Sequence, residues 1–122
     1  MQNSTFTKNY AGNIIGNGGA IASETNNMVV TNCTFVNNQA NKNGGAIYTN
    51  GNANIDSATF IDDNHASNAG GAIYTKGDLT LTGANSFDNC YANSNGGAIY
   101  TVGDLTLTGV NTFNTNKANG GN

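Results

Sequence analysis

The stretch Gly70-Gly71-Ala72-Ile73-Tyr74-Thr75 decides the fold, because close copies of it recur along the chain. Gly-Gly-Ala-Ile begins at Gly18, Gly44, Gly70 and Gly96, at intervals of 26 residues. A fixed period between about 20 and 50 residues is typical of solenoids, propellers and other repeat arrays. The chain is therefore expected to consist of one repeated unit.

Each unit contains three short segments with strand-like sequences, which in one unit are Ala72–Thr75, Leu79–Thr82 and Ser86–Asn89. Leu79–Thr82 alternates apolar and polar residues, which is typical of a strand with one buried face. A propeller blade needs four strands in about 40 residues, and a leucine-rich repeat needs more Leu, so neither fits. The sequence predicts an all-β solenoid of parallel coils, with about 4.5 coils of ~26 residues and three short strands per coil.

The glycine pairs divide this single domain into a partial coil 1–17, full coils 18–43, 44–69, 70–95 and 96–119, and the start of a further coil at 120–122. Stacking turns equivalent positions into ladders that run along the solenoid. The structural repeat motif comprises the glycine pairs Gly18-Gly19, Gly44-Gly45, Gly70-Gly71 and Gly96-Gly97, the isoleucines Ile21, Ile47, Ile73 and Ile99, and the phenylalanines Phe6, Phe35, Phe60, Phe87 and Phe113.

Three further columns are expected from the same alignment. The sequence predicts a second inward ladder of Val29, Ile55, Leu81 and Leu107, an alanine ladder of Ala11, Ala40, Ala66, Ala92 and Ala118, and a turn column of Asn26, Asn52, Asp78 and Asp104. The paired glycines are expected at a tight corner that a Cβ would obstruct. Asn and Asp suit turns because their side chains bond locally and tolerate left-handed backbone.

Composition excludes several functional classes. Charged residues make up 9% of the chain, the net charge is −3, and all four basic residues are Lys, so no basic stripe for nucleic acid exists. No apolar run is long enough to span a membrane. Low hydrophobicity usually indicates disorder only when net charge and Pro are high, and this chain has no Pro. The 17 Gly and 25 Asn are better explained by turns in a repeat.

Gly-Gly-Ala-Ile together with Phe-x-x-Asn resembles the repeat of the chlamydial polymorphic outer-membrane proteins and of related adhesin-like proteins. The Phe-x-x-Asn half is present at Phe6–Asn9, Phe35–Asn38 and Phe113–Asn116, whereas Asn64 comes one residue late after Phe60 and Cys90 replaces Asn after Phe87. The resemblance implies a right-handed β-helix displayed outside the cell as an adhesin or passenger segment. It carries over no catalytic residue and no cofactor.

Asp62, Asp63 and His65 are the candidates for an enzymatic alternative, a polysaccharide-acting β-helix. Glycoside hydrolysis usually needs two carboxylates that face one cleft. Neighbouring residues of a strand point to opposite faces, so Asp62 and Asp63 fit a shared site poorly. A bulge in a polar loop is the preferred interpretation, and we expect no enzyme.

Cys33 and Cys90 occupy different columns two coils apart, so they are expected to be unpaired and buried.

Asp78 and Asp104 are expected to stack one coil apart, where two carboxylates could bind a cation. Turn chemistry explains them better, and no metal or other cofactor is expected. Thr80, Thr82, Thr106 and Thr108 form an outward array only two coils deep, with Met28, Val30, Asn54 and Asp56 as the expected equivalents, which argues against an ice-binding surface.

Tyr48, Tyr74 and Tyr100 are predicted to form an outward ladder that offers contact area to a host-cell, glycan or protein ligand, although sheet-favouring stacking explains them equally.

The leading hypothesis is a non-catalytic β-helical segment of an extracellular or cell-surface adhesin-like protein, acting as a rigid scaffold or adhesive surface. The alternative is a subunit of an extracellular filament that stacks head to tail through uncapped solenoid ends, since a heterologous contact propagates without closing.

Overall fold

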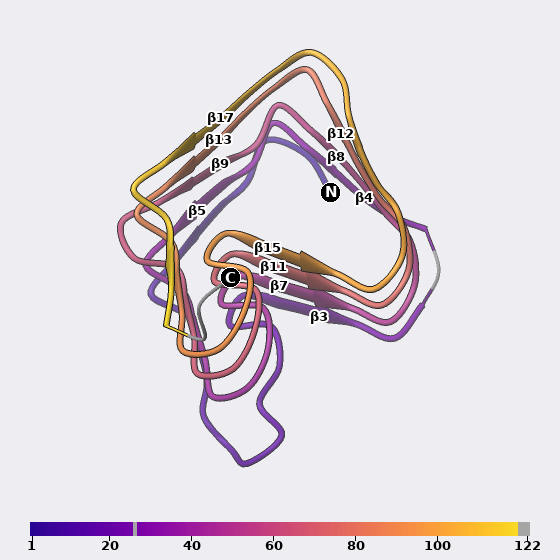
Figure 1. The fold of residues 1–122 in the computed structure, drawn as a ribbon. Helices are drawn as coiled ribbons and strands as arrows, with labels where there is room; N and C mark the ends of the chain where they lie inside the picture. Colours follow the sequence, from indigo (N-terminus) through magenta and orange to yellow (C-terminus); the bar gives the residue numbers. More distant parts are fainter. Residues whose placement is uncertain (26, 120–122) are drawn as a thin grey trace.

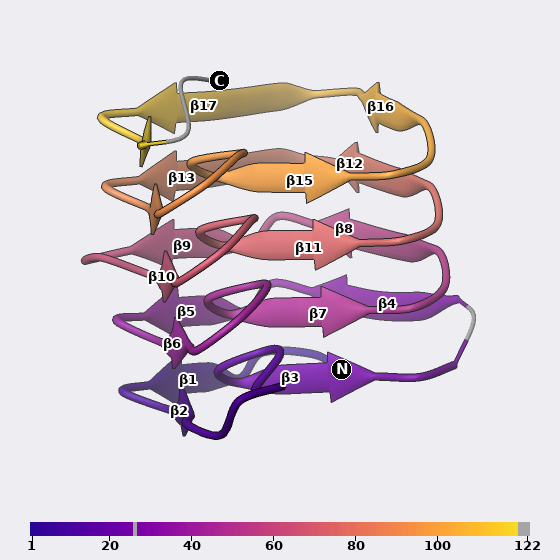
Figure 2. The same cartoon turned by 60° about the horizontal axis from the view of Figure 1, so that its bottom comes forward.

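The computed structural model describes residues 1–25 and 27–119 and is an all-β solenoid of stacked parallel strands. Seen along its axis the chain traces one closed outline repeatedly (Figure 1), and seen from the side the coils lie in layers from β1 to β17 (Figure 2). The two views together show that the chain winds counterclockwise as it approaches the viewer of Figure 1. The β-helix is therefore right-handed, as expected.

Four parallel sheets form the walls, and each is named here by its side chains or its size. The Phe sheet contains β1 (Thr5–Thr7), β5 (Thr34–Val36), β9 (Thr59–Ile61), β13 (Ala84–Asp88) and β17 (Val110–Asn114). The Tyr sheet contains β3 (Ile21–Ser23), β7 (Ile47–Thr49), β11 (Ile73–Thr75) and β15 (Ile99–Thr101). The Thr sheet contains β4 (Met28–Thr31), β8 (Ala53–Asp56), β12 (Leu79–Thr82) and β16 (Leu105–Leu107).

The fourth sheet was not expected from the sequence. This short sheet consists of two-residue strands: β2 (Tyr10–Ala11), β6 (Gln39–Ala40), β10 (His65–Ala66), β14 (Tyr91–Ala92) and β18 (Lys117–Ala118). Two residues give too little alternation for a strand pattern to be read from sequence. The three expected strand columns are all present, and the short sheet adds a fourth wall on which the predicted alanine ladder lies in register.

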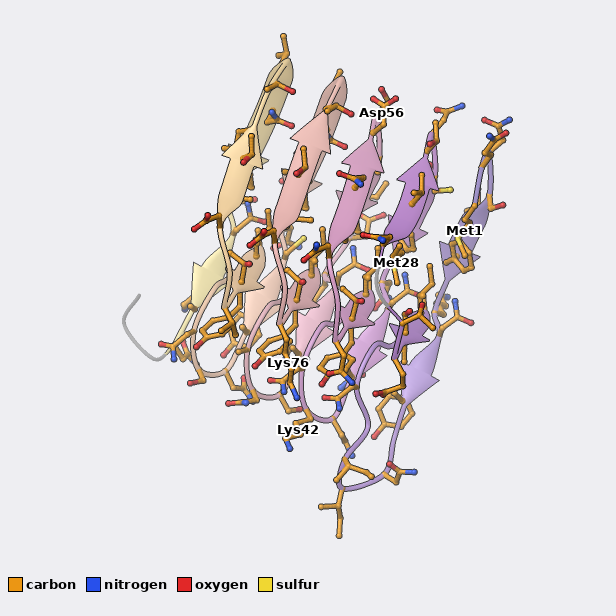
Figure 3. All side chains as sticks on the ribbon, turned by 90° about the vertical axis from the view of Figure 1, so that its right-hand side faces the viewer. Met1, Met28, Lys42, Asp56 and Lys76 are labelled. Carbon is orange, nitrogen blue, oxygen red and sulfur yellow. The ribbon has the colours of Figure 1, made fainter. Side chains whose placement is uncertain are left out.

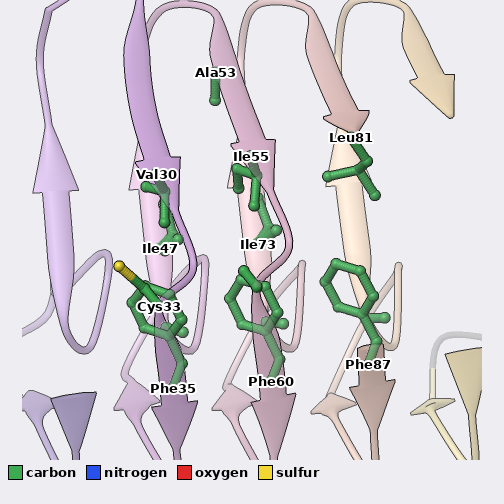
Figure 4. Packing of buried hydrophobic residues seen from close by; sticks show 14 of the residues in the cluster. Val30, Cys33, Phe35, Ile47, Ala53, Ile55, Phe60, Ile73, Leu81 and Phe87 are labelled. Atoms are coloured by element: carbon green, nitrogen blue, oxygen red, sulfur yellow. The ribbon is translucent and has the colours of Figure 1, made fainter. Parts of the chain in front are cut away.

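The core is a set of ladders made by equivalent residues (Figure 4). The phenylalanine rings stack along the solenoid with centroids 4.7–5.0 Å apart and planes within 7° of parallel. The isoleucines of the Tyr sheet stand in register, and Ile47 and Ile73 are fully buried. Because each coil alone covers little apolar surface, burial comes mainly from the coils above and below.

One predicted ladder is wrong by a single residue. Val30, not Val29, pairs with Ile55, and Val30 is fully buried while Val29 is 53% exposed. Four residues, 24–27, separate β3 from β4, whereas three separate β7 from β8, so the extra residue shifts the register of β4. Because side chains alternate between faces, a one-residue slip exchanges inside for outside. The ladder continues as predicted through Leu81 and Leu107.

The glycine pairs have two different roles. The first glycine of each pair has a positive φ of 66–71°, which L-residues rarely adopt. The second glycine approaches the next coil closely: a Cβ on Gly71 would lie 1.9 Å from the carbonyl oxygen of Gly97. A corner with no room for a Cβ is what the sequence predicted.

Buried asparagines form a column that the spacing from Phe concealed. Asn9, Asn38, Asn64, Cys90 and Asn116 occupy equivalent positions just before the short sheet. Asn38 and Asn64 are fully buried, and the backbone N–H of Asn38 donates to Oδ1 of Asn64 over 3.0 Å. Asn64 is in register despite the extra residue before it, because Asp62 and Asp63 both adopt positive φ and absorb the insertion.

Candidate functional site

The tyrosine ladder lies on the face of the Tyr sheet opposite its buried isoleucines. The rings of Tyr48 and Tyr74 stack with centroids 5.4 Å apart, and those of Tyr74 and Tyr100 with centroids 5.0 Å apart. The register of β7, β11 and β15 places the three residues directly opposite one another. The predicted ladder is therefore present in the fold.

Stacking limits what this ladder can offer to a ligand. Tyr48 is only 5% exposed and its hydroxyl lies 2.8 Å from Oδ1 of Asn50, while Tyr74 and Tyr100 are half-buried. Because the ring of Tyr74 is covered on both flat faces by its neighbours, a ligand meets its ring edge and hydroxyl. The contact role of the ladder stays a prediction, carried by Tyr74 and Tyr100 more than by Tyr48.

The hydroxyl of Tyr74 is held in its neutral form. Burial raises the pKa of Tyr74 above its ordinary value of 10.0, and the neighbouring Tyr100 and Tyr48 raise it further, with Lys76 acting in the opposite direction. A neutral phenol both donates and accepts hydrogen bonds. This edge of the ladder can therefore donate a hydrogen bond to a ligand or accept one from it.

The outward face of the Thr sheet is a mixed column and not a threonine array. Thr80 pairs with Asn54 and Thr106, and Asn54 pairs in turn with Val29. The equivalents expected in the first coil, Met28 and Val30, are wrong for the same one-residue reason as above, and Val29 and Thr31 occupy these positions. Asp56 and Asn54 interrupt the column, so regular Thr-x-Thr spacing is confined to the last two coils.

The residues of the enzymatic alternative lie on a polar corner. Asp62 and Asp63 are exposed and follow β9 in left-handed conformation, as expected for a bulge. His65 begins β10, where its ring contacts Tyr91 edge-on with centroids 4.9 Å apart and its Nε2 lies 3.4 Å from Oδ1 of Asn93. Within residues 1–25 and 27–119 the structure contains no pocket and no cluster of three metal-ligating side chains.

The two cysteines are unpaired and buried, as predicted. Cys33 and Cys90 are each 1% exposed. Burial raises the pKa of the Cys90 thiol from 9.0 to about 12, and a hydrogen bond from Asn64 partly opposes this rise. A neutral, buried thiol is neither a good nucleophile nor a metal ligand.

The turn column next to the Thr sheet follows turn chemistry. The backbone N–H of Asp78 donates to Oδ1 of Asn52, and that of Asp104 donates to Oδ1 of Asp78, both over 2.8 Å. One carboxylate oxygen of Asp78 therefore accepts a hydrogen bond from the next coil. The expected member Asn26 lies outside the described residues, as do Gly120 and Gly121.

A feature that the sequence analysis missed is the loop before β3. It spans residues 12–20, nine residues, whereas the equivalent loops 41–46, 67–72 and 93–98 have six. The backbone N–H of Gly16 donates to the carbonyl oxygen of Asn13 over 2.8 Å, which closes a turn with Ile14 and Ile15 at its tip. These side chains are 92% and 70% exposed. The sequence features that could have indicated this projection are the greater length of the loop and two adjacent isoleucines in an otherwise polar segment.

Comparisons with known proteins agree with the repeat seen in the structure. Residues 32–50 and 58–76 match the family described as Chlamydia polymorphic membrane protein repeat. Each matched segment runs through a strand of the Phe sheet, the short strand, the glycine pair and a strand of the Tyr sheet. A search of curated proteins gave no match, and a search of solved structures gave none either.

Over the part of the chain that the structure describes, no helix has the length and apolar character needed to cross a membrane.

The two matched segments lie in adjacent coils and carry the Phe, Asn, Gly-Gly and Ile positions that form the ladders. Residues 32–50 and 58–76 are thus similar to two adjacent repeats of the family described as Chlamydia polymorphic membrane protein repeat.

Proposed function

We propose that this chain is a non-catalytic segment of an extracellular or cell-surface protein, and that it serves as a rigid scaffold that presents a repeating adhesive surface. The observation that carries this proposal is the continuity of the ladders. Phenylalanine, isoleucine and alanine columns run through successive coils, and the asparagine column, which is interrupted at Cys90, hydrogen-bonds neighbouring coils to one another. A stack of this kind is stiff along its axis and displays each outward residue at a fixed spacing of about 4.8 Å.

The family match supports a surface location, since the family is that of a membrane-protein repeat. The chemistry of the described residues supports a structural role. The buried polar side chains hydrogen-bond to neighbouring coils, and the candidate acids Asp62 and Asp63 lie on an exposed bulge. These side chains serve turns and stacking, which leaves the outer faces of the Tyr and Thr sheets as the contact surfaces.

The test is adhesion of particles that carry the chain. Beads coated with the chain at a fixed density are passed over an epithelial cell layer under flow, and the retained beads are counted. The matched variant is Tyr74→Thr with Tyr100→Thr, which keeps a β-favouring residue at each position but removes the aromatic edges. Retention that falls several-fold in this variant is the expected result. Retention of the native chain no higher than that of bare beads would remove the adhesive part of the proposal.

A filament subunit is the second candidate, and one observation favours it. The last described coil exposes apolar ladder residues that are buried in the middle coils: Phe113 is 44% exposed and Leu107 is 47% exposed, whereas Phe60 and Leu81 are fully buried. A second copy stacked in register would cover them and pair the open strand edges. Negative-stain electron microscopy over a range of concentrations distinguishes the two candidates. Uniform fibres support the filament, and discrete particles at every concentration oppose it.

A further inference from the structure

The loop at residues 12–20 breaks the regularity of the solenoid at one place. Its three extra residues push the turn Asn13–Gly16 beyond the outline that the other loops share (Figure 1). Ile14 and Ile15 occupy the two central positions of that turn and are 92% and 70% exposed. The insertion therefore places two large aliphatic side chains at the outermost point of the loop.

These isoleucines contribute nothing evident to folding. Neither isoleucine has a positive φ, and Asn13 and Gly16 at the two ends of the turn fit a type I turn, whose central positions accept most residues. Neither side chain belongs to the buried cluster that forms the core. The turn therefore does not require isoleucine, and adjacent large apolar side chains that are exposed and unpacked are where a contact with a partner is expected.

The base of the loop differs in character from its tip. The ring of Tyr10 lies against Gly12, is 59% exposed, and donates through its hydroxyl to Oδ1 of Asn41 over 3.1 Å. The backbone N–H of Lys42, one coil further on, donates to the carbonyl oxygen of Gly16 over 2.9 Å. Figure 3 shows Lys42 on the same side of the molecule as the projecting loop. An aromatic ring and a lysine thus lie at the base of the loop, behind its apolar tip.

Charge is distributed unevenly around this edge. Lys42 is the only charged residue in the four loops 12–20, 41–46, 67–72 and 93–98 that stack here. The seven acidic residues of the chain lie at other positions: Glu24, Asp56, Asp62, Asp63, Asp78, Asp88 and Asp104. The tip therefore projects from a neutral-to-positive edge of a molecule whose net charge is −3.

We propose that Ile14 and Ile15 insert into the surface of a lipid bilayer, with Tyr10 and Lys42 at the level of the headgroups. The order of the side chains along the projecting loop favours a lipid bilayer over a protein partner. Aliphatic groups reach furthest, Tyr favours the water–lipid boundary, and the Lys ammonium remains near lipid phosphates while its stem stays apolar. A convex tip also suits a deformable surface, because it needs no preformed pocket.

The size of the tip sets the expected strength. Two isoleucines bury less apolar area than a fatty-acyl chain, and a single myristoyl chain gives only reversible binding, with a constant on the order of 10⁴ M⁻¹. That constant corresponds to half-saturation at about 0.1 mM accessible lipid, so the loop, which buries less apolar area, should need a higher lipid concentration. Such a contact orients a protein that other interactions already hold near a membrane.

The test uses tryptophan as a reporter, because the native chain contains none. Ile14→Trp is titrated with vesicles of phosphatidylcholine and phosphatidylserine, alone and with acyl-brominated lipid. The expected result is a blue shift of the emission and quenching by bromine. Val29→Trp is the matched control, since Val29 is 53% exposed on the Thr sheet, and its emission should not change.

A sedimentation experiment complements the reporter. The native chain should co-sediment with vesicles at millimolar lipid, and Ile14→Asn with Ile15→Asn should reduce the bound fraction at least fivefold, while Val29→Asn leaves it unchanged. Emission of Ile14→Trp that stays as in water, or equal sedimentation of the native chain and the double variant, would overturn the proposal. Loss of self-association in the double variant without any vesicle binding would equally overturn it, because the tip would then serve a protein contact.

Discussion

Nδ2 of Asn64 donates a hydrogen bond to the backbone carbonyl oxygen of Phe35, one coil below, over 3.0 Å. Asn38 makes the equivalent bond to Phe6 over 2.9 Å, and Asn116 makes it to Phe87 over 3.0 Å. The Phe-x-x-Asn motif is therefore a coupling between coils. The phenylalanine of one coil supplies a carbonyl to the asparagine of the next, while its ring joins the stacked core.

Replacing Asn64 with Ala should destabilise the solenoid by about 3 kcal/mol. The variant removes the donor to Phe35 and the acceptor that pairs the backbone N–H of Asn38, and each unpaired buried group costs about 1–3 kcal/mol. Urea unfolding followed by circular dichroism measures the loss. Asn54→Ala is the control, because Asn54 is exposed on the Thr sheet and its loss should change stability by less than about 0.5 kcal/mol. Equal stability of both variants would show that the column has no stabilising role.

Cys90→Asn should stabilise the chain by about 1 kcal/mol, the net value of a typical intramolecular hydrogen bond. Cys90 interrupts the asparagine column, and its Sγ lies 3.9 Å from the carbonyl oxygen of Phe60, too far for a strong bond. An asparagine there would lie between Asn64 and Asn116, as Asn38 lies between Asn9 and Asn64. The midpoint of thermal unfolding should rise, and a clear fall would mean that this coil cannot accommodate the larger side chain.

The Cys90 thiol should make stability depend on alkaline pH. Its pKa is raised from 9.0 to about 12 by burial, so the folded chain keeps a proton that the unfolded chain releases above pH 9. The thiol's contribution is complete below pH 9 and is lost as the pH rises towards 12, at about 1.4 kcal/mol per pH unit. The stability difference between the native chain and Cys90→Ala, measured by urea unfolding from pH 8 to 11, should shrink accordingly. A difference that stays constant over this range would contradict the burial of the thiol, and the raised pKa of Tyr74 affects both chains alike.

Phe60→Ala should cost about 3–5 kcal/mol, because the ring is fully buried between two others. Phe113 is the matched comparison in the same column, since it is 44% exposed and stacks on one ring among the described residues. Phe113→Ala should cost less than half as much in the isolated chain. Chemical denaturation of both variants gives the ratio, and equal costs would argue against a stack whose burial increases towards the middle.

The repeat period and its apolar residues were sufficient to predict the solenoid, since the isoleucine, phenylalanine and alanine columns all stand in the expected register. Val29 was misplaced because only the length of the turn 24–27 decides which valine faces inward. No alternation across a four-residue strand reveals such a shift. The register of β4 follows from the fact that segment 24–27 is one residue longer than its equivalent, segment 50–52.

The asparagine column shows how the choice of reference residue matters. Counted from Phe, Asn64 comes one residue late, but counted back from Ala66 it holds the same place as Asn38 does before Ala40. The bulge at Asp62 and Asp63 explains why, because the insertion lies between the two references. The exposed tip at Ile14 and Ile15 was not predicted for a related reason: the extra residues of loop 12–20 have no equivalents in the other coils, so the repeat does not place them.

The central claim is that equivalent residues of successive coils stack in parallel register, and nuclear Overhauser contacts in the isotope-labelled chain test it most directly. The account predicts contacts between the rings of Phe35, Phe60 and Phe87, and between Ile47, Ile73 and Ile99, always one coil apart and without antiparallel cross-strand Hα–Hα contacts. Antiparallel contacts, or contacts that link Phe60 to neither Phe35 nor Phe87, would contradict the solenoid and the functions proposed from it.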